Sequence, residues 1–275
     1  MKKAFTITEL LVAVGLLAAV LAASTMIFHY AIEAQRTAMA TAEIMRTMRA
    51  ITDQLNMDFA GLRTSDAPMI MEFHGDPNDA NKADSVVFFA NGDFQTSDGT
   101  VTSPVARIYY GQSGFVQNVC PNPYSHKLTN DIKDPCDTRN KIFARKQVLI
   151  APSLTVLSPT GEYDINDISK QVKDYNAVPA VGNAWISRPN VNSNDANYIP
   201  MYLAKGVDNF SIMYSSGISG GKITWLPATN TNNRLYFGLS GTAYPALIKF
   251  TFTLYDSKKI LKTGRTFEHI VYIGN

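Results

Sequence analysis

A carboxylate stands at the start of the most apolar stretch of this chain, in a setting that demands a partner. Glu9 directly precedes residues 10–28, which carry no formal charge and contain only two hydroxyl side chains, Ser24 and Thr25. A carboxylate in a bilayer costs about 2.5–3.5 kcal/mol at the centre and less near the edge. Because a buried charge needs a partner, we expect Glu9 to require one.

The two cysteines, Cys120 and Cys136, bracket a loop rich in Pro, Asn and Asp. In an oxidising compartment this arrangement favours a disulfide. Closing a loop of roughly 16 residues would stabilise the fold by about 3 kcal/mol. Two free thiols are the alternative, and a metal site would need more ligands than the single intervening His126.

Three other patterns bear on catalysis or binding. Residues 217–221 match GxSxG, but strand-like residues follow where a nucleophile elbow needs a helix, so we predict a glycine-rich hairpin turn. Residues 76–84 offer several oxygens for calcium without the EF-hand spacing, which favours a solvated turn. The four histidines are dispersed. We therefore expect no catalytic residue, cofactor or metal, and a protein that is not an enzyme.

The apolar run that follows Glu9 determines the expected compartment. Residues 10–28 would form about 28 Å of helix, which matches the thickness of a hydrocarbon core. Lys2 and Lys3 precede it, so the N-terminus is expected in the cytoplasm and the rest of the chain across the inner membrane, in the periplasm of a bacterium with two membranes. A cleaved export signal ending near residues 22–24 is the alternative. Glu9 and the helical pattern beyond Ser24 argue against it.

Helical patterning continues past the apolar run. Residues 31–63 contain no Pro, and their only Gly is Gly61. Apolar residues recur there at spacings of three and four, which predicts one apolar stripe. The members of the stripe are Met45, Met48, Ile51, Leu55, Phe59 and Leu62. Most charged residues of the segment, among them Asp58, fall off it. The sequence thus predicts a helix of nearly 60 residues whose second half packs on a β-sheet.

The remaining two-thirds of the chain is predicted to be rich in β-strands. Strands are expected at residues 85–90, 107–111, 143–150, 210–214, 222–226, 247–255 and 265–273. The segment 107–111 is expected to form a hairpin with 115–116, and the last two strands a terminal hairpin with one apolar face. Residues 151–200 form a long polar insertion. The formal net charge of +2 gives no indication of a nucleic-acid partner.

The N-terminal segment AFTITEL, residues 4–10, resembles the processing site of type IV prepilins and pseudopilins. The resemblance implies cleavage between Ala4 and Phe5, N-methylation of Phe5, and an assembly role for Glu9. The family usually has Gly before the cut, where this chain has Ala4. The new amine of Phe5 in one subunit could then pair with Glu9 of its neighbour. The alternative is a tolerated interfacial glutamate that reaches the headgroups.

The order of segments in the rest of the chain is similar to the J-type minor pseudopilins of type II secretion and the W-type minor pilins. These segments are 51–58, 84–89, 107–110, 203–210 with Tyr214, and 244–252. The fold implied is α+β and pilin-like, with a long helix packed on an antiparallel head. Its divisions are a leader (1–4), a membrane and assembly helix (5–30), an amphipathic continuation (31–63) and a periplasmic head (64–275) that carries the insertion.

The resemblance implies a structural subunit of a type II secretion pseudopilus or a type IV pilus tip. Its partners would be other minor and major pseudopilins or pilins, a prepilin peptidase, the inner-membrane assembly platform and inner-membrane lipid. The alternative is a membrane-anchored periplasmic module that uses a pilin-like anchor and binds a ligand through aromatic residues of the insertion. Those residues are Tyr163, Tyr175, Trp185 and Tyr198.

Overall fold

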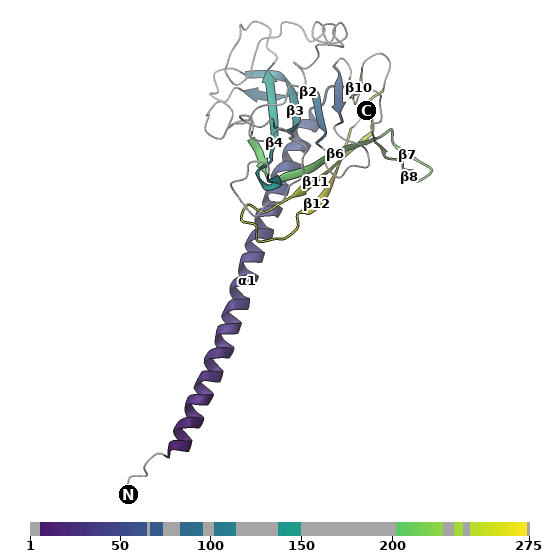
Figure 1. Ribbon diagram of the computed structural model, residues 1–275. Coiled ribbons are helices and arrows are strands. Elements are labelled where there is room, and N and C mark those ends of the chain that lie inside the picture. The colour runs from purple at the N-terminus through teal and green to yellow at the C-terminus, as the bar shows by residue number, and fades with distance from the viewer. Residues whose placement is uncertain are drawn as a thin grey trace.

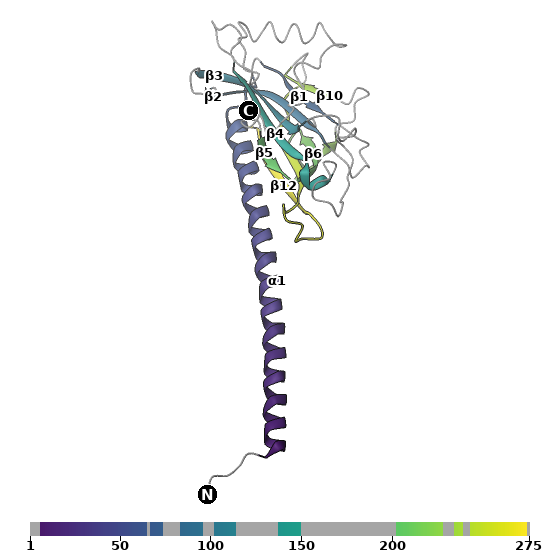
Figure 2. The same cartoon turned by 60° about the vertical axis from the view of Figure 1, so that its left-hand side comes forward.

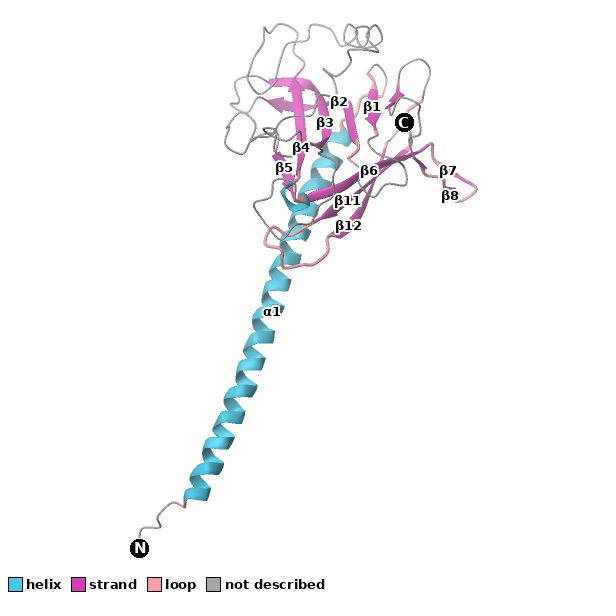
Figure 3. Cartoon of the chain, viewed as in Figure 1, coloured by secondary structure: helices cyan, strands magenta, loops and turns pink. Residues whose placement is uncertain are grey.

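The computed structural model describes residues 6–64, 67–73, 83–95, 102–113, 137–149, 202–227, 234–238 and 243–273. These ranges form one long helix and a head of antiparallel strands (Figure 3), so the fold is α+β. A six-stranded sheet contains β1 (Met69–Glu72), β2 (Ser85–Gln95), β3 (Thr102–Gln112), β4 (Ile142–Leu149), β5 (Tyr202–Lys205) and β10 (Arg234–Phe237). A four-stranded sheet contains β6 (Val207–Ser215), β9 (Leu226–Pro227), β11 (Leu247–Leu254) and β12 (Arg265–Tyr272). The hairpin β7 (Ile218–Ser219) and β8 (Lys222–Ile223) and the 3₁₀ helix η1 (Thr138–Asn140) complete the set.

Helix α1 (Ile7–Ala60) is continuous over 54 residues, as predicted. Only its C-terminal part lies against the head, and the rest extends away from it (Figure 1). The helix ends three residues earlier than predicted because the chain turns at once into sheet pairing. The Gly61 carbonyl accepts a 2.7 Å hydrogen bond from the Asn91 amide, and the Arg63 amide donates to the Phe89 carbonyl. The end of α1 is therefore joined directly to β2.

The six-stranded sheet has the order β10-β1-β2-β3-β4-β5, and all of its strand pairs are antiparallel. β4 coincides closely with a predicted strand, β2 and β3 are each longer than predicted, and β1, β5 and β10 were not predicted as strands. The predicted hairpin of residues 107–111 with 115–116 is wrong. One edge of β3 is paired with β2 and the other with β4, so no edge is free for that partner.

The four-stranded sheet has the order β12-β11-β6-β9. The predicted terminal hairpin is confirmed, with β11 and β12 in register over all eight residues of each strand. Its predicted apolar face is buried: Ile248, Phe250, Phe252 and Leu254 are each at most 1% exposed. The strand predicted at 222–226 is instead split between β8 and β9. The glycine-rich turn predicted at 217–221 is confirmed as the β7–β8 hairpin.

A ring of six buried aromatic side chains joins the helix and the two sheets. Phe59 of α1 lies 4.2 Å from Phe88 and 5.5 Å from Phe250, centroid to centroid. Tyr110 and Phe143 continue the ring on the larger sheet, and Phe210 closes it back to Phe250 at 5.9 Å. Offset and tilted rings at such spacings stabilise a core beyond the area they bury. The three layers therefore share one core, with α1 along one side of the head (Figure 2).

The buried stripe of α1 differs from the predicted one in two places. Ile51, Leu55 and Phe59 are buried as expected, but Ile44 occupies the position expected for Met45. Asp58, placed off the stripe by its charge, is only 4% exposed. The burial of Asp58 is the largest error in the prediction of the helix. It results from contacts with side chains of the head.

Candidate functional site

The first turn of α1 satisfies the Glu9 carboxylate within its own chain. Thr6 is the N-cap, and its hydroxyl oxygen accepts from the Glu9 amide at 3.3 Å. In return, Glu9 Oε2 accepts from the Thr6 amide at 2.9 Å and from the Thr6 hydroxyl at 2.8 Å. This is a capping box, in which two donors that no helical bond can satisfy are paired reciprocally. Caps of this kind are worth about 1 kcal/mol.

The N-terminal half of α1 presents an apolar surface on every side. Its most apolar 18-residue window has a mean hydropathy of 2.5 and is not buried by any other part of the described chain. Large side chains such as Leu11, Leu16 and Phe28 are 64–71% exposed. Soluble monomers rarely expose continuous apolar surface of this size. By length and composition the helix can cross a membrane.

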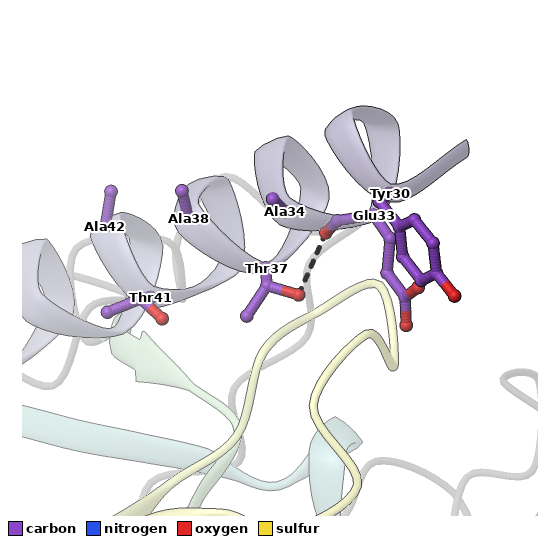
Figure 4. Close-up of a pocket in the computed structure, with 7 residues that line it drawn as sticks. All are labelled: Tyr30, Glu33, Ala34, Thr37, Ala38, Thr41 and Ala42. Atoms are coloured by element: carbon purple, nitrogen blue, oxygen red, sulfur yellow. Dashed lines mark hydrogen bonds between the residues drawn. The ribbon is translucent and has the colours of Figure 1, made fainter. Parts of the chain in front are cut away.

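A groove of about 770 Å³ runs along α1 between this apolar half and the packed half (Figure 4). Its lining residues all belong to the helix: Tyr30, Glu33, Ala34, Thr37, Ala38, Thr41 and Ala42. The Thr37 hydroxyl donates back to the Glu33 carbonyl at 3.0 Å, so this hydroxyl is paired within the helix. Ala34, Ala38 and Ala42 stand at four-residue spacing and leave this part of the helix surface shallow.

The C-terminal end of α1 is fixed to the head by a buried charge. Arg145 of β4 donates from Nε to Asp58 Oδ2 at 2.6 Å and from its terminal nitrogen to Oδ1 at 2.8 Å. The hydroxyl of Tyr110 and the amide of Gln54 also donate to this carboxylate. Burial raises the pKa of Tyr110 well above its usual range, and the Asp58 charge raises it further. Burial disfavours the Arg145 cation, but its bonds to Asp58 outweigh that cost and raise the pKa of Arg145.

A second buried ion pair holds the corner between the sheets. Lys141 donates to Asp208 at 2.6 Å, and their side chains are 3% and 0% exposed. Between β5 and β6 the chain turns at Gly206, whose φ is +74°. A Cβ there would lie 2.8 Å from the Tyr255 carbonyl oxygen, so the turn requires glycine. This corner orients the four-stranded sheet toward α1.

Of the predicted site residues, Glu9 lies within the described part of the chain. Ala4, Phe5, Cys120 and Cys136 lie outside the described residues, as do nearly all of 76–84 and the whole insertion 151–200. The processing site, the disulfide and any calcium binding therefore stay predictions. Thr6 was missed, although the Thr-x-x-Glu spacing at a helix start is itself the signature of a capping box.

Asp58 was also missed as an anchor. Its partner Arg145 is 87 residues distant in sequence, so no local pattern identifies the pair. Within the described ranges, no group of three or more His, Cys, Asp or Glu residues is arranged to hold a metal ion. None of the protein-family models, curated proteins or solved structures compared with this chain matches it.

Proposed function

We propose that this chain is a minor pilin-like subunit that assembles through the N-terminal half of α1, as part of a type II secretion pseudopilus or a type IV pilus tip. The proposal rests on one observation: α1 is a single unbroken helix whose N-terminal part is exposed and whose C-terminal part is partly buried against the head. Residues 7–39 are exposed almost throughout, and burial begins at Ala40. The exposed half needs lipid or neighbouring helices around it. The packed half makes the helix and the head one body.

In the proposed assembly, two partners compete for the Glu9 carboxylate: Thr6 of the same chain and the Phe5 amine of a neighbouring subunit. In the isolated chain, Glu9 is satisfied by Thr6. Cleavage before Phe5 would add a cation within one turn of the same carboxylate. In a stack of staggered helices, the amine of one subunit reaches Glu9 of the next. An ion pair in a low-dielectric setting outweighs a cap worth about 1 kcal/mol, so assembly draws Glu9 away from Thr6.

The proposal is tested by expressing the full chain together with a prepilin peptidase and its neighbouring subunits. N-terminal sequencing should begin at a methylated Phe5. Glu9→Leu should lower the yield of crosslinked oligomers by about tenfold or more, because each such pair contributes more than 1.4 kcal/mol. Glu33→Gln is the matched control, since Glu33 is an exposed carboxylate of the same helix outside the apolar run.

Two outcomes would contradict the proposal. One is a mature protein that begins at Ser24 or keeps Met1, because neither end supplies an amine at the depth of Glu9. The other is a Glu9→Leu chain that crosslinks as efficiently as the Glu33→Gln control, because the carboxylate would then have no part in assembly.

A further inference from the structure

The loop between β11 and β12, residues 255–264, lies at the end of the head that faces the apolar half of α1. It is the part of the head closest to the N-terminal half of the helix in two views (Figures 1 and 2). Two bonds fix it to α1: the Ser257 amide donates to Glu43 at 3.3 Å, and Arg265 donates to the Thr41 hydroxyl at 3.3 Å. Its distance from the apolar run is therefore set by the helix.

Basic side chains predominate on the solvent side of this loop. Lys258, Lys262 and Arg265 are exposed. Lys259 is drawn inward, where its Nζ lies 3.6 Å from the buried Asp137. The loop contains one carboxylate, Asp256, which is 1% exposed.

The carboxylates near the loop, Asp256 and Glu43, offset part of its charge but are directed at backbone amides and not at the exposed basic side chains. Asp256 accepts from the amides of Ile260 and Leu261 at 2.7 and 3.0 Å, so it holds the loop's own backbone. On the helix face beneath the loop, Glu43 is engaged with the backbone of Ser257. Glu33 and Arg36, which lie closer to the apolar run, have opposite charges and together add no net charge near the loop. The exposed side chains of the loop and its flanking arginine thus carry three positive charges.

The position of the loop places these charges near a bilayer surface. Thr41 lies thirteen positions after Phe28, the end of the apolar run, which corresponds to about 20 Å of helix. The polar headgroup layer takes about 5–8 Å of that distance. Membrane helices tilt by about 20° on average, and a tilt toward the loop shortens the remaining gap. The remaining gap of about 12–15 Å exceeds the screening length of about 8 Å, so the attraction acts once the helix tilts toward the loop.

We propose that the β11–β12 loop docks the head on the anionic headgroups of the bilayer that α1 crosses, through Lys258, Lys262 and Arg265. The inference rests on the membrane anchoring in the proposed function and adds to it a lipid contact made by the head. A single membrane helix can tilt in any direction. Attraction between the loop and anionic lipid favours the tilt that brings the loop toward the headgroups. The head of the unassembled subunit therefore leans with this loop toward the membrane, and extraction into a filament breaks the contact.

The test uses the full chain in nanodiscs of phosphatidylcholine alone or mixed with phosphatidylglycerol. A photoreactive p-benzoylphenylalanine replaces Thr263, which is exposed between the basic residues, and lipid adducts are measured by mass spectrometry. Adducts should form several-fold more in the anionic nanodiscs. Lys258→Gln with Lys262→Gln should lower their yield by about tenfold or more, given the attraction per basic residue near an anionic surface.

The matched control is Lys205→Gln with Lys222→Gln, which removes the same charge from exposed positions on β5 and β8, and it should leave the yield unchanged. Equal yields in the two lipids, equal loss in the control, or adducts formed only with a second copy of the chain would overturn the lipid contact. Failure of the chain to enter either nanodisc overturns the membrane anchoring, and the lipid contact with it. Entry without adducts overturns the lipid contact alone.

Discussion

Replacing Arg145 with methionine tests whether the buried charge at the end of α1 fixes the helix to the head. Asp58 is 4% exposed and Arg145 16% exposed by side chain. Methionine keeps much of the apolar volume of the arginine stem but removes both donors. Asp58 then retains only the Tyr110 hydroxyl and the Gln54 amide. Removing one partner of a buried ion pair costs about 3–5 kcal/mol because the other charge stays uncompensated.

The loss should be visible as a lower unfolding temperature. For domains of this size, 1 kcal/mol corresponds to about 2–4 °C, so Arg145→Met should lower Tm by about 6–20 °C. The assay is thermal unfolding of the full chain in detergent, followed by the near-UV signal of the buried aromatic ring. Adding Asp58→Asn removes the stranded charge, so the double variant should recover about 1 kcal/mol or more of the loss.

A surface ion pair provides the control for this reasoning. Lys249 and Glu268 lie 3.4 Å apart, and Glu268 is 60% exposed, so Glu268→Gln should cost less than about 1 kcal/mol. If Arg145→Met shifts Tm no further than Glu268→Gln, the pair does not anchor the helix. A double variant less stable than Arg145→Met alone would equally refute the stranded-charge argument.

Two further predictions concern the same packed end of the molecule. A Cβ on Gly61 would lie 2.0 Å from the Asn91 carbonyl oxygen, so Gly61→Ala should cost about 1–3 kcal/mol in thermal unfolding. The Gly15→Ala control, with nothing within 4 Å, should not lower Tm because alanine favours helix more than glycine does, and an equal fall in both variants would show that helix and sheet are not in close contact. Burial lowers the pKa of His269 despite the opposing charge of Asp53, so its stabilisation is complete above about pH 6.5 and is lost as pH falls through the lowered value. The fall in Tm between about pH 7.5 and 5.5 should therefore be smaller in His269→Gln than in the parent, and an unchanged fall would assign it to other groups.

Local sequence patterns predicted the elements whose formation depends mainly on residues close together in the chain. The alternation in β11 identified its buried face, because successive side chains of a strand point to opposite sides. The absence of Gly and Pro between residues 31 and 60 predicted that the helix continues well beyond the apolar run. By contrast, β1 is only four residues long and pairs with β10, so that Glu72 meets Arg234 across 162 positions. Nothing near either strand in the sequence reveals the other.

Asp58 shows a second kind of limit. An aspartate in a helical pattern is ordinarily solvated, so reading the pattern by charge puts it on the outer face. Its true environment depends on donors from β3 and β4, which the sequence does not place beside α1. Glu9 could be identified because its demand for a partner arises from the surrounding run alone. For Asp58 the same reasoning, applied without the tertiary contacts, gives the wrong face of the helix, and the expected cation partner of Glu9 stays a prediction.

Glu9 and Asp58 are 49 positions apart on α1, about 74 Å of helix, and their partners differ in a way that bears on the proposed function. Asp58 is held by a guanidinium on a strand that is itself paired on both edges, so exchanging that partner would require the head to unfold. Glu9 is held by the hydroxyl and amide of its own first turn, which are weak and replaceable. A subunit that must enter and leave an assembly needs a fixed contact at the head and an exchangeable one in the membrane. If Thr6→Val, which removes the hydroxyl and keeps the amide, increases crosslinked oligomers, the cap competes with assembly as proposed. If it decreases them in parallel with Glu9→Leu, the cap is part of the assembled state instead.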